Sequence, residues 1–480
     1  MKSFLKKFED LCIKESKIIV ILFLLIIVFA IVNIIINRIN IRNDELITEN
    51  LSTLTNISKE LISKIQDEEE IKVYLFDYGA DDYVSTFAKK YEQLNKNIIV
   101  EIKKAKEDEE LASSYGIKEG EYDILIISGE NSRLIKEDDL YSYDYNTGNV
   151  IDLTEQRLTN GIVQVTSVGE RIPLYILKGH EKYVLENELS IIKRYVELEN
   201  YELKELDLSS DDIPEDCNII MINTMNSDFL DEETDKIKDY INNGGNILWL
   251  EDAKIEEIEY SNVKSVLEMF GVEDIKAGVV FEQDNENIIL QNPYLILPKI
   301  NDIEVLGDFD TQGKVMFYYS TRLNFVEDER LKELNVKKID LLSTSDKALL
   351  KTDFSNDVMS KKEGDEEGKF IVGALLEKSL EEGKKSKLMI YANNYFITNN
   401  VIKIGKEDIS VVDLYNNREL INNSINYLSE NQNNLEITKL VPRNYYIGIE
   451  NNSVKQALIV EGIILIVFVR NHDIYKKKKK

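Results

Sequence analysis

Several polar residues that could bind a ligand or move a proton directly follow stretches that read as buried strands. Thr224 follows the apolar run 218–222, Glu251 and Asp252 follow 246–250, and His180 and Glu181 follow the strand 171–177. In an open α/β sheet, sites lie beyond the carboxyl ends of the strands. This edge is therefore where the sequence places a candidate interaction site.

Asn394 belongs to the same group of candidates, because it follows a late apolar run at 387–392. A ligand-binding cleft would then be lined by Thr224, Glu251 and Asn394. Structural roles are open for the same residues. The Gly179-His180-Glu181 triplet also fits a turn whose side chains bond to the backbone. Neighbouring residues on a strand point to opposite faces, so Glu251 and Asp252 also fit loop capping, and asparagines favour turns.

The sequence lacks the groups that the commonest enzyme chemistries require. A nucleophile elbow needs a Ser or Cys between glycines after a strand, whereas the turn after 218–222 reads NTMNSD. Cys217 precedes that strand instead of following it, and there is no Walker A motif. Cys12 and Cys217, and likewise His180 and His472, are expected on opposite sides of a membrane, so they cannot form a Cys/His zinc site, while a calcium site made of carboxylates remains open. We expect no enzyme activity, no catalytic residue, no cofactor and no metal.

The segment 214–252 explains how the candidate residues are positioned. Its two apolar runs flank a helical pattern, for which Asp231 is the predicted N-cap and Gly244-Gly245 the stop. Strand, helix and strand in this order form a βαβ unit, which requires a parallel sheet with a right-handed crossover. We therefore predict an α/β fold in which residues 151–430 form a larger flavodoxin- or Rossmann-like parallel domain, with a disordered loop near 353–369.

A smaller α/β domain is predicted at residues 70–150. Strands are expected at 71–76, 98–102 and 122–127, with a helix at 81–94 between the first two. This order resembles a thioredoxin-like core. The CxxC pair of thiol oxidoreductases is missing, which argues against redox chemistry.

Both ends of the chain have the composition of membrane segments. A basic head at 1–17 precedes the apolar run 18–36, whose length suffices for a bilayer core of about 30 Å. A helical stalk is expected at 38–67, a second transmembrane helix at 454–470 and a basic cytoplasmic tail at 471–480. Basic residues favour the cytoplasmic side, so both termini are expected there and the main body is expected to be extracytoplasmic. Glu461 within the second segment faces either a partner or the outer interface.

The charge of the chain narrows the choice of partners. Its formal net charge is −29, and such an acidic body repels nucleic acid, so no nucleic-acid partner is expected. The terminal lysines are suited to contact with anionic membrane lipid.

Four local features in a fixed order resemble one family. They are listed here in chain order: Gly179-His180-Glu181 at a strand end; Ile213-Pro214 before a strand, followed by Leu230-Asp231-Glu232-Glu233 and a helix ending in Gly244-Gly245; the segment 393–400; and the helix 417–428. Together with the two membrane ends, they make the chain similar to GldG-like, gliding-motility-associated auxiliary components of ABC transporters. The family commonly has Gly-Asp-Ser-Asp-Phe where this chain has Ala392-Asn393-Asn394-Tyr395-Phe396.

The resemblance implies a non-catalytic extracytoplasmic auxiliary subunit in the cell membrane. Its partners would be an ABC-2-type permease, on which it docks, and a cytoplasmic ATPase subunit. Two alternatives stay open. One is a stand-alone, membrane-anchored ligand-binding or sensory ectodomain, and the other is an amidotransferase-like hydrolase.

Overall fold

The computed structural model describes residues 54–65, 70–144, 149–166, 171–255, 259–275, 277–301, 303–306, 313–353, 361–404, 407–429 and 443–445. The chain divides into the units 1–56 and 57–480, and almost all described residues belong to the second. The predicted head, the anchor at 18–36, most of the stalk, the second membrane segment at 454–470 and the tail lie outside the described residues. Among the helices within the described ranges, none is long and apolar enough to cross a bilayer.

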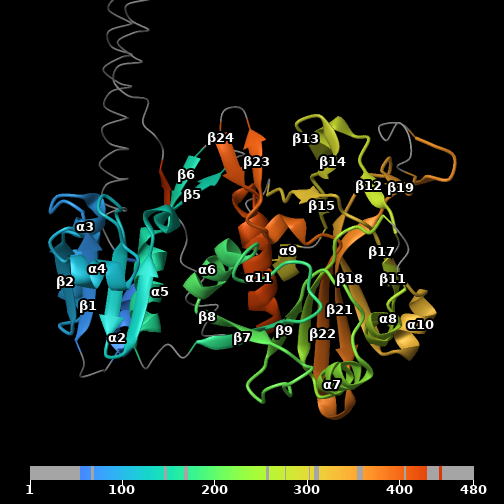
Figure 1. Cartoon of the computed structure of the whole chain (residues 1–480), viewed down its shortest axis with the longest axis horizontal. Coiled ribbons are helices and arrows are strands. Elements are labelled where there is room, and N and C mark those ends of the chain that lie inside the picture. Colours follow the sequence, from blue (N-terminus) through green and yellow to red (C-terminus); the bar gives the residue numbers. More distant parts are fainter. Residues whose placement is uncertain are drawn as a thin grey trace, which may run out of the picture. The chain divides into compact units, whose positions relative to one another are not determined.

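A four-stranded sheet organises the first part of the described chain (Figure 1). Its strands are β1 (Ile71–Phe76), β2 (Ile98–Lys103), β3 (Ile124–Ser128) and β4 (Asn131–Ile135), in the order β2-β1-β3-β4. The first two strands are parallel and are joined through helix α3 (Tyr83–Leu94), whereas β3 and β4 run antiparallel to their neighbours. The helix α4 (Glu109–Ser114) lies between β2 and β3 in the chain.

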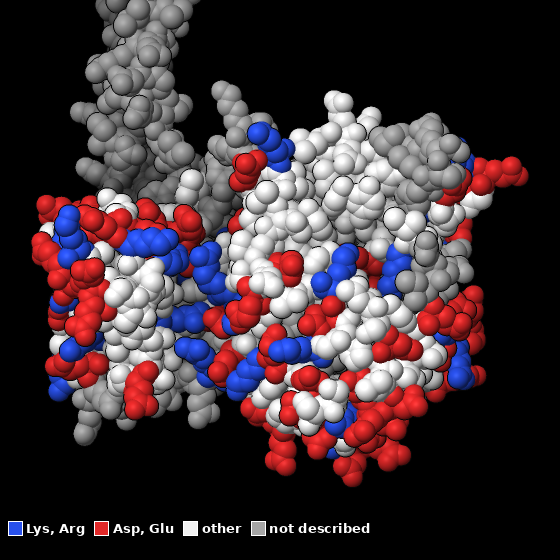
Figure 2. All heavy atoms as spheres, viewed as in Figure 1, with Lys and Arg blue, Asp and Glu red and all other residues white. Residues whose placement is uncertain are grey.

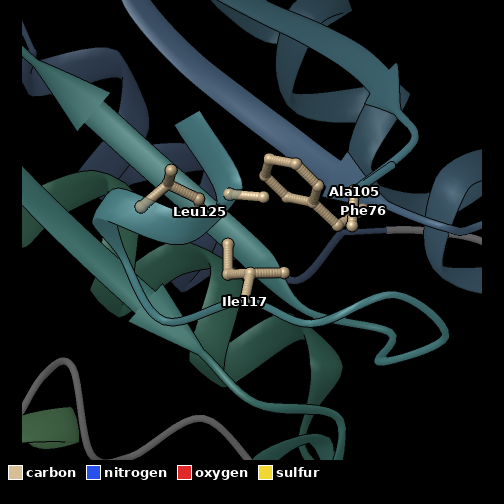
Figure 3. Close-up of a cluster of buried hydrophobic side chains, with 5 residues drawn as sticks. Phe76, Ala105, Ile117 and Leu125 are labelled. Atoms are coloured by element: carbon tan, nitrogen blue, oxygen red, sulfur yellow. The ribbon is translucent and has the colours of Figure 1, made fainter. Parts of the chain in front are cut away.

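The core of this smaller domain is apolar, and a helix beyond residue 150 contributes to it. Phe76, Ala105, Ala112, Ile117 and Leu125 pack together as buried side chains (Figure 3). Helix α5 (Thr154–Gln164) also packs on the sheet, because a Cβ at its Gly161 would lie 2.7 Å from the Ile126 side chain. The predicted boundary at 150 therefore separates α5 from the sheet that it covers.

A second sheet has eight strands, in the order β15-β18-β21-β22-β10-β9-β7-β8. The parallel strands are β7 (Ile172–Leu177), β8 (Tyr201–Leu206), β9 (Ile219–Ile222), β10 (Asn246–Leu250) and β22 (Lys385–Tyr391). The antiparallel strands are β15 (Lys299–Ile300), β18 (Val336–Ser343) and β21 (Ile371–Ser379). The larger domain is thus mixed: the predicted parallel sheet is present in β7, β8, β9, β10 and β22, and the prediction is wrong for β15, β18 and β21, which pair antiparallel.

The βαβ unit predicted at 214–252 is present as β9, α7 (Asp231–Asn242) and β10, with Ile247 opposite Ile220 in parallel register. The helix start differs in detail from the prediction. Asp231 is the first helical residue, and the carboxylate of Glu233 accepts the Leu230 N–H at 2.7 Å in place of an Asp231 cap. At the other end Gly244 has φ +98°, a conformation that glycine adopts without strain.

Helices cover both faces of this sheet. Tyr391 lies opposite Leu250, and its hydroxyl is 2.7 Å from Ser424 Oγ in helix α11 (Asn417–Ser429). Side chains alternate between faces along a strand, so Trp249 points to the opposite face. There it contacts Phe229, which lies two residues before the start of α7.

The segment between β10 and β18 folds into short antiparallel pieces. The buried end of the loop predicted to be disordered near 353–369 is also ordered. Lys351 Nζ lies 2.6 Å from Asp365 Oδ2, and both side chains are buried. Residues 354–360 lie outside the described part of that loop.

The remaining helices are α2 (Asn56–Lys64), α6 (Ser190–Leu198), α8 (Ser261–Leu267), α9 (Ile303–Leu306) and α10 (Asp328–Glu333). The remaining strands are β5 (Tyr141–Asp144), β6 (Asn149–Asp152), β11 (Val272–Ile275), β12 (Val279–Phe281), β13 (Ile288–Ile289), β14 (Asn292–Ile296), β16 (Phe317–Tyr318), β17 (Leu323–Phe325), β19 (Leu349–Lys351), β20 (Glu366–Glu367), β23 (Val401–Ile404), β24 (Glu407–Ser410) and β25 (Arg443–Tyr445).

Candidate functional site at the carboxyl edge of the eight-stranded sheet

The parallel strands β7, β9, β10 and β22 all end at one edge of the large sheet, called the carboxyl edge below. Within the parallel half the strand order is β8-β7-β9-β10-β22. From β7 the chain runs to β8 on one side, and from β8 it returns past β7 to β9 on the other side. Such a reversal is the point at which open α/β sheets commonly bind ligands.

The turn after β7 is held by side-chain hydrogen bonds. His180 Nδ1 is 2.8 Å from Ser227 Oγ, and its Nε2 is 2.9 Å from Glu233 Oε2 at the start of α7. The Glu181 carboxylate accepts the Gly179 N–H. Glu181 therefore bonds to the backbone as the structural interpretation of this triplet predicts. His180 instead joins the loop after β9 to α7.

Asp252, directly after β10, is the hub of this edge. One carboxylate oxygen accepts the Tyr183 hydroxyl at 2.6 Å and lies 2.9 Å from Lys182 Nζ. The other accepts the backbone N–H groups of Asn394 at 2.7 Å and Tyr395 at 3.0 Å. These bonds connect the segments that follow β7, β10 and β22.

Thr224 adds the segment after β9 to this network, because its hydroxyl oxygen accepts the Asp252 N–H at 2.9 Å. Asp252 is only 6% exposed. Its hydrogen bonds are therefore shielded from water and hold four strand ends in a fixed relation. The predicted loop-capping role belongs to Asp252.

Glu251 has a different environment from its neighbour. Its side chain is 1% exposed; Oε2 accepts the Trp249 Nε1–H at 3.3 Å, and Oε1 is 3.4 Å from Lys254 Nζ. Oε1 accepts no hydrogen bond from the described residues, although it lies within ion-pair distance of Lys254. Burial raises the pKa of the Glu251 carboxyl from 4.5 to about 7, and nearby Lys254 limits the rise.

Asn394 is fully buried, and neither its Oδ1 nor its Nδ2 has a hydrogen-bond partner among the described residues. Asn223, at the end of β9, likewise has an unpartnered Oδ1, while its Nδ2 donates to the Tyr183 carbonyl at 3.2 Å. Buried polar groups are normally hydrogen-bonded. Among the described residues, these two amides therefore leave three buried polar atoms without a partner at the carboxyl edge.

The structure brings five of the six predicted residues to this edge: His180, Glu181, Thr224, Glu251 and Asn394. The sixth, Glu461, lies outside the described residues. Sequence reasoning missed Lys182, Tyr183 and Lys254 as partners of the two acids. The only local signal for them was their position just after a strand end.

A second feature lies at the opposite, amino edge of the same sheet. A cavity of about 590 Å³ is formed there by the segment before β9 and the end of α7. Its lining residues are Asp212, Ile213, Pro214, Glu215, Cys217, Asn218, Lys236, Asp239, Tyr240, Asn243, Gly244, Gly245 and Asn246. Burial raises the pKa of the Cys217 thiol to about 12, so this thiol stays protonated and unreactive at neutral pH.

The surface around α7 is acidic. Asp and Glu side chains gather near α7 and the turn between β21 and β22 (Figure 2). Exposed acids in these two elements include Asp231, Glu232, Asp235, Asp239, Glu381 and Glu382. Within the described ranges, no group of three or more His, Cys, Asp or Glu side chains has the arrangement of a metal site.

Comparison with protein families matches residues 172–287 to ABC_transp_aux, described as an ABC-type uncharacterized transport system. The matched segment begins with β7 and includes the βαβ unit and the hub residue Asp252. It links this part of the larger domain to ABC-type transport at the level of the family. A comparison with curated proteins finds no match.

Solved structures similar to this chain include the mmIFT52 N-terminal domain, at 13% identity and a TM-score of 0.39, covering 54% of this chain and 98% of that domain. Another is the exo-beta-1,4-mannosidase Op5Man5 from Opitutaceae bacterium strain TAV5, at 8% identity and a TM-score of 0.25. That match covers 72% of this chain and 48% of the mannosidase.

Proposed function

We propose that this chain is a non-catalytic auxiliary subunit of an ABC-2-type transporter, GldG-like in type, that docks on the permease in the cell membrane. The observation that carries the proposal is the family match over residues 172–287. The matched segment contains the turn after β7, the βαβ unit and Asp252, whose carboxylate bonds to the segments after β7 and β22.

The polar groups at the carboxyl edge support a structural role over a catalytic one. Asp252 and His180 each form hydrogen bonds to neighbouring segments, and these bonds stabilise the carboxyl edge. Cys217 has a raised pKa and precedes β9, where a nucleophile elbow would follow it. We therefore propose that the extracytoplasmic body acts by binding other proteins through its surface.

The membrane placement of the proposal rests on the sequence of the two ends. The apolar segment 18–36 is the anchor, 454–470 is the second span, and the acidic body lies outside the cytoplasm. The partners are the permease, a cytoplasmic ATPase subunit and, at the basic tail, anionic lipid. In this arrangement residues 70–166 form a thioredoxin-like domain, supported by the β2-β1-β3-β4 order, and the parallel half of the large sheet is flavodoxin-like.

Deletion of residues 18–36 tests this proposal. The shortened chain is expected to be released from the membrane with a folded body, as judged by its circular dichroism, and to lose its association with the permease. The matched control replaces 18–36 with an unrelated transmembrane helix of equal length. Full assembly of the freed body with the permease would contradict the proposed membrane docking.

The cavity at the amino edge favours a second candidate, a ligand-binding or sensory ectodomain that acts without a transporter. At about 590 Å³ it falls within the size range of small-molecule sites. This candidate predicts a small molecule that raises the melting temperature of the full-length chain. The increase should disappear when Tyr240, in the cavity wall, is replaced by Ala.

A further inference from the structure

Glu251 has three properties that the structural hydrogen bonds of the carboxyl edge do not explain. It is buried at the end of the central strand β10, one of its oxygens accepts no hydrogen bond within the described ranges, and the other bonds to Trp249. A permanently ionised carboxylate would be costly at such a site. If a permanently neutral side chain were needed at this position, a glutamine would serve and no lysine would be needed beside it. The pairing with Lys254 suits a group that exists in both states.

Among the described residues, charged and titratable groups near Glu251 come from its own loop and from neighbouring elements. Its own loop contributes Lys254 and Asp252, of which the first favours and the second disfavours the ionised form. The Lys254 ammonium also lies 4.4 Å from the ring centre of Tyr260, the residue that precedes α8. Asp228, from the segment before α7, acts on the same tyrosine and caps the start of α8.

His180, with its partner Glu233, adds two more titratable groups on this face of the sheet. Its ring packs edge-on against Phe229 at 5.6 Å between centroids, and Phe229 in turn packs against Trp249 at 6.3 Å. His180 is thus one aromatic ring removed from Trp249. Any test of Glu251 must separate these two groups.

We propose that Glu251 is a buried proton-binding site, and that its proton occupancy controls the packing of the loop that follows β10. In the protonated state the neutral carboxyl fits its buried site and Lys254 is held only weakly. On release of the proton to solvent, the carboxylate attracts the Lys254 ammonium and strengthens the bond from the Trp249 N–H. The inference concerns a property of the fold and is independent of the transporter role.

The loop in question is well placed to transmit this change. Asp252 follows Glu251 directly and bonds to the segments after β7 and β22, and Ala253 donates its N–H to the Tyr319 carbonyl at 3.4 Å. A shift of Lys254 toward Glu251 therefore acts on the loop that contains Asp252, whose hydrogen bonds hold four strand ends together. The midpoint of this change near pH 7 follows from the raised pKa of Glu251.

Trp249 reports on this site directly, because it is the only tryptophan in the chain. The experiment is a titration of the purified full-length chain from pH 5 to pH 9, with selective indole excitation to suppress the 25 tyrosines. We expect the emission to change in one transition with a midpoint at about 7. A titration that stays flat across this range, as it would if Glu251 kept the ordinary glutamate pKa of about 4.3, would overturn the proposal.

Three variants identify the titrating group. Glu251→Gln should remove the transition, because the amide does not titrate. Lys254→Met keeps the aliphatic stem but removes the charge that favours ionisation, so the midpoint should rise above that of the unchanged chain. His180→Asn should keep the transition. Loss of the transition in His180→Asn, or an unshifted midpoint in Lys254→Met, would assign the signal elsewhere and contradict the proposal.

The test does not depend on the stability of a single variant. Lys254 is partly exposed, so its substitution leaves the buried packing intact, and the unchanged chain alone gives the midpoint. A transition in a folded Glu251→Gln protein would also refute the assignment.

Discussion

The two edges of the large sheet differ in how their polar groups are used. At the carboxyl edge, Asp252, Thr224 and His180 bond to neighbouring loops and the groups lie close together in a buried network. At the amino edge, the end of α7 and the segment before β9 leave a cavity of about 590 Å³ with a protonated thiol in its wall. Structural hydrogen bonds thus occupy the edge where α/β folds usually bind ligands, and a cavity lies at the other end of the strands.

This difference teaches that position at a strand end does not by itself assign chemistry. Residues of types that suit catalysis, such as His180 and Asp252, have partners that account for their presence. Glu251 is the exception, since burial shifts its pKa into the neutral range and its Oε1 accepts no hydrogen bond in the described parts of the chain.

The largest expected effect comes from breaking the carboxyl-edge network. Asp252→Ala removes the acceptor for four groups, including the buried N–H of Asn394, and should lower the free energy of unfolding by about 3–5 kcal/mol. Asp239→Ala, at an exposed position of the amino edge, should change it by less than about 0.5 kcal/mol. Urea unfolding of both variants makes the comparison, and equal losses would contradict the difference between the two edges.

The second effect is the pH dependence that Glu251 gives to stability. Because its folded pKa is about 7 against 4.5 in the unfolded chain, the folded state binds more protons between these values. The contribution is fully present below pH 4.5 and is lost as pH rises to 7, a decrease of about 3 kcal/mol.

Unfolding experiments at pH 5 and pH 8 check this sign. The stability difference between the two pH values should be smaller in Glu251→Gln than in the unchanged chain. Glu282→Gln is the matched control, because Glu282 is also buried but accepts hydrogen bonds from Ser345. A variant at Glu251 with the full pH dependence would count against the raised pKa.

A smaller effect is expected from adding a methyl group at Gly245, at the amino edge. A Cβ at Gly245 would lie 2.2 Å from the nearest ring atom of Tyr240, so Gly245→Ala should lower the free energy of unfolding by about 1–3 kcal/mol. The same change in a Tyr240→Ala background should cost less, because the ring is gone. A double-mutant cycle measures this coupling, and additive losses would show that the ring does not set the cost.

Apart from the Asp239→Ala control, the smallest effect is expected for Cys217→Ala. The buried thiol has a raised pKa and only weak contacts to the Ile219 carbonyl and the Tyr240 hydroxyl, at 3.7 and 3.8 Å. We expect a loss of about 1 kcal/mol in stability and unchanged co-purification with the permease. Loss of function in a folded Cys217→Ala protein would favour the hydrolase alternative.

The parts of the fold that the sequence predicts are those set by local pattern. The apolar runs around β9 and β10, the helical spacing of α7 and the glycine stop at Gly244 lie within one short segment, so their order alone implies a parallel pair. The parallel pair also predicts that Thr224 and Glu251 lie at the same edge of the sheet, where Asn394 joins them after a later strand. The sequence therefore predicts which residues lie at this edge, but it does not predict their contacts.

The rest depends on contacts between distant residues. Asp252 meets Tyr183 across 69 positions and Asn394 across 142, and no local pattern signals either pairing. The antiparallel strands β18 and β21 were missed because short apolar runs such as 371–376 do not reveal their partner or direction. The ordered end of the 353–369 loop is due to the buried contact between Lys351 and Asp365, two residues that look exposed in sequence.

The central claim is that the chain serves an ABC transporter, and co-purification tests it most directly. The tagged full-length chain is extracted from native membranes in a mild detergent, and its companions are identified and quantified by mass spectrometry. The account predicts an ABC permease and its ATPase in a fixed ratio to the chain. A solitary chain, recovered under conditions that keep other transporters intact, would contradict it and favour the ligand-binding ectodomain.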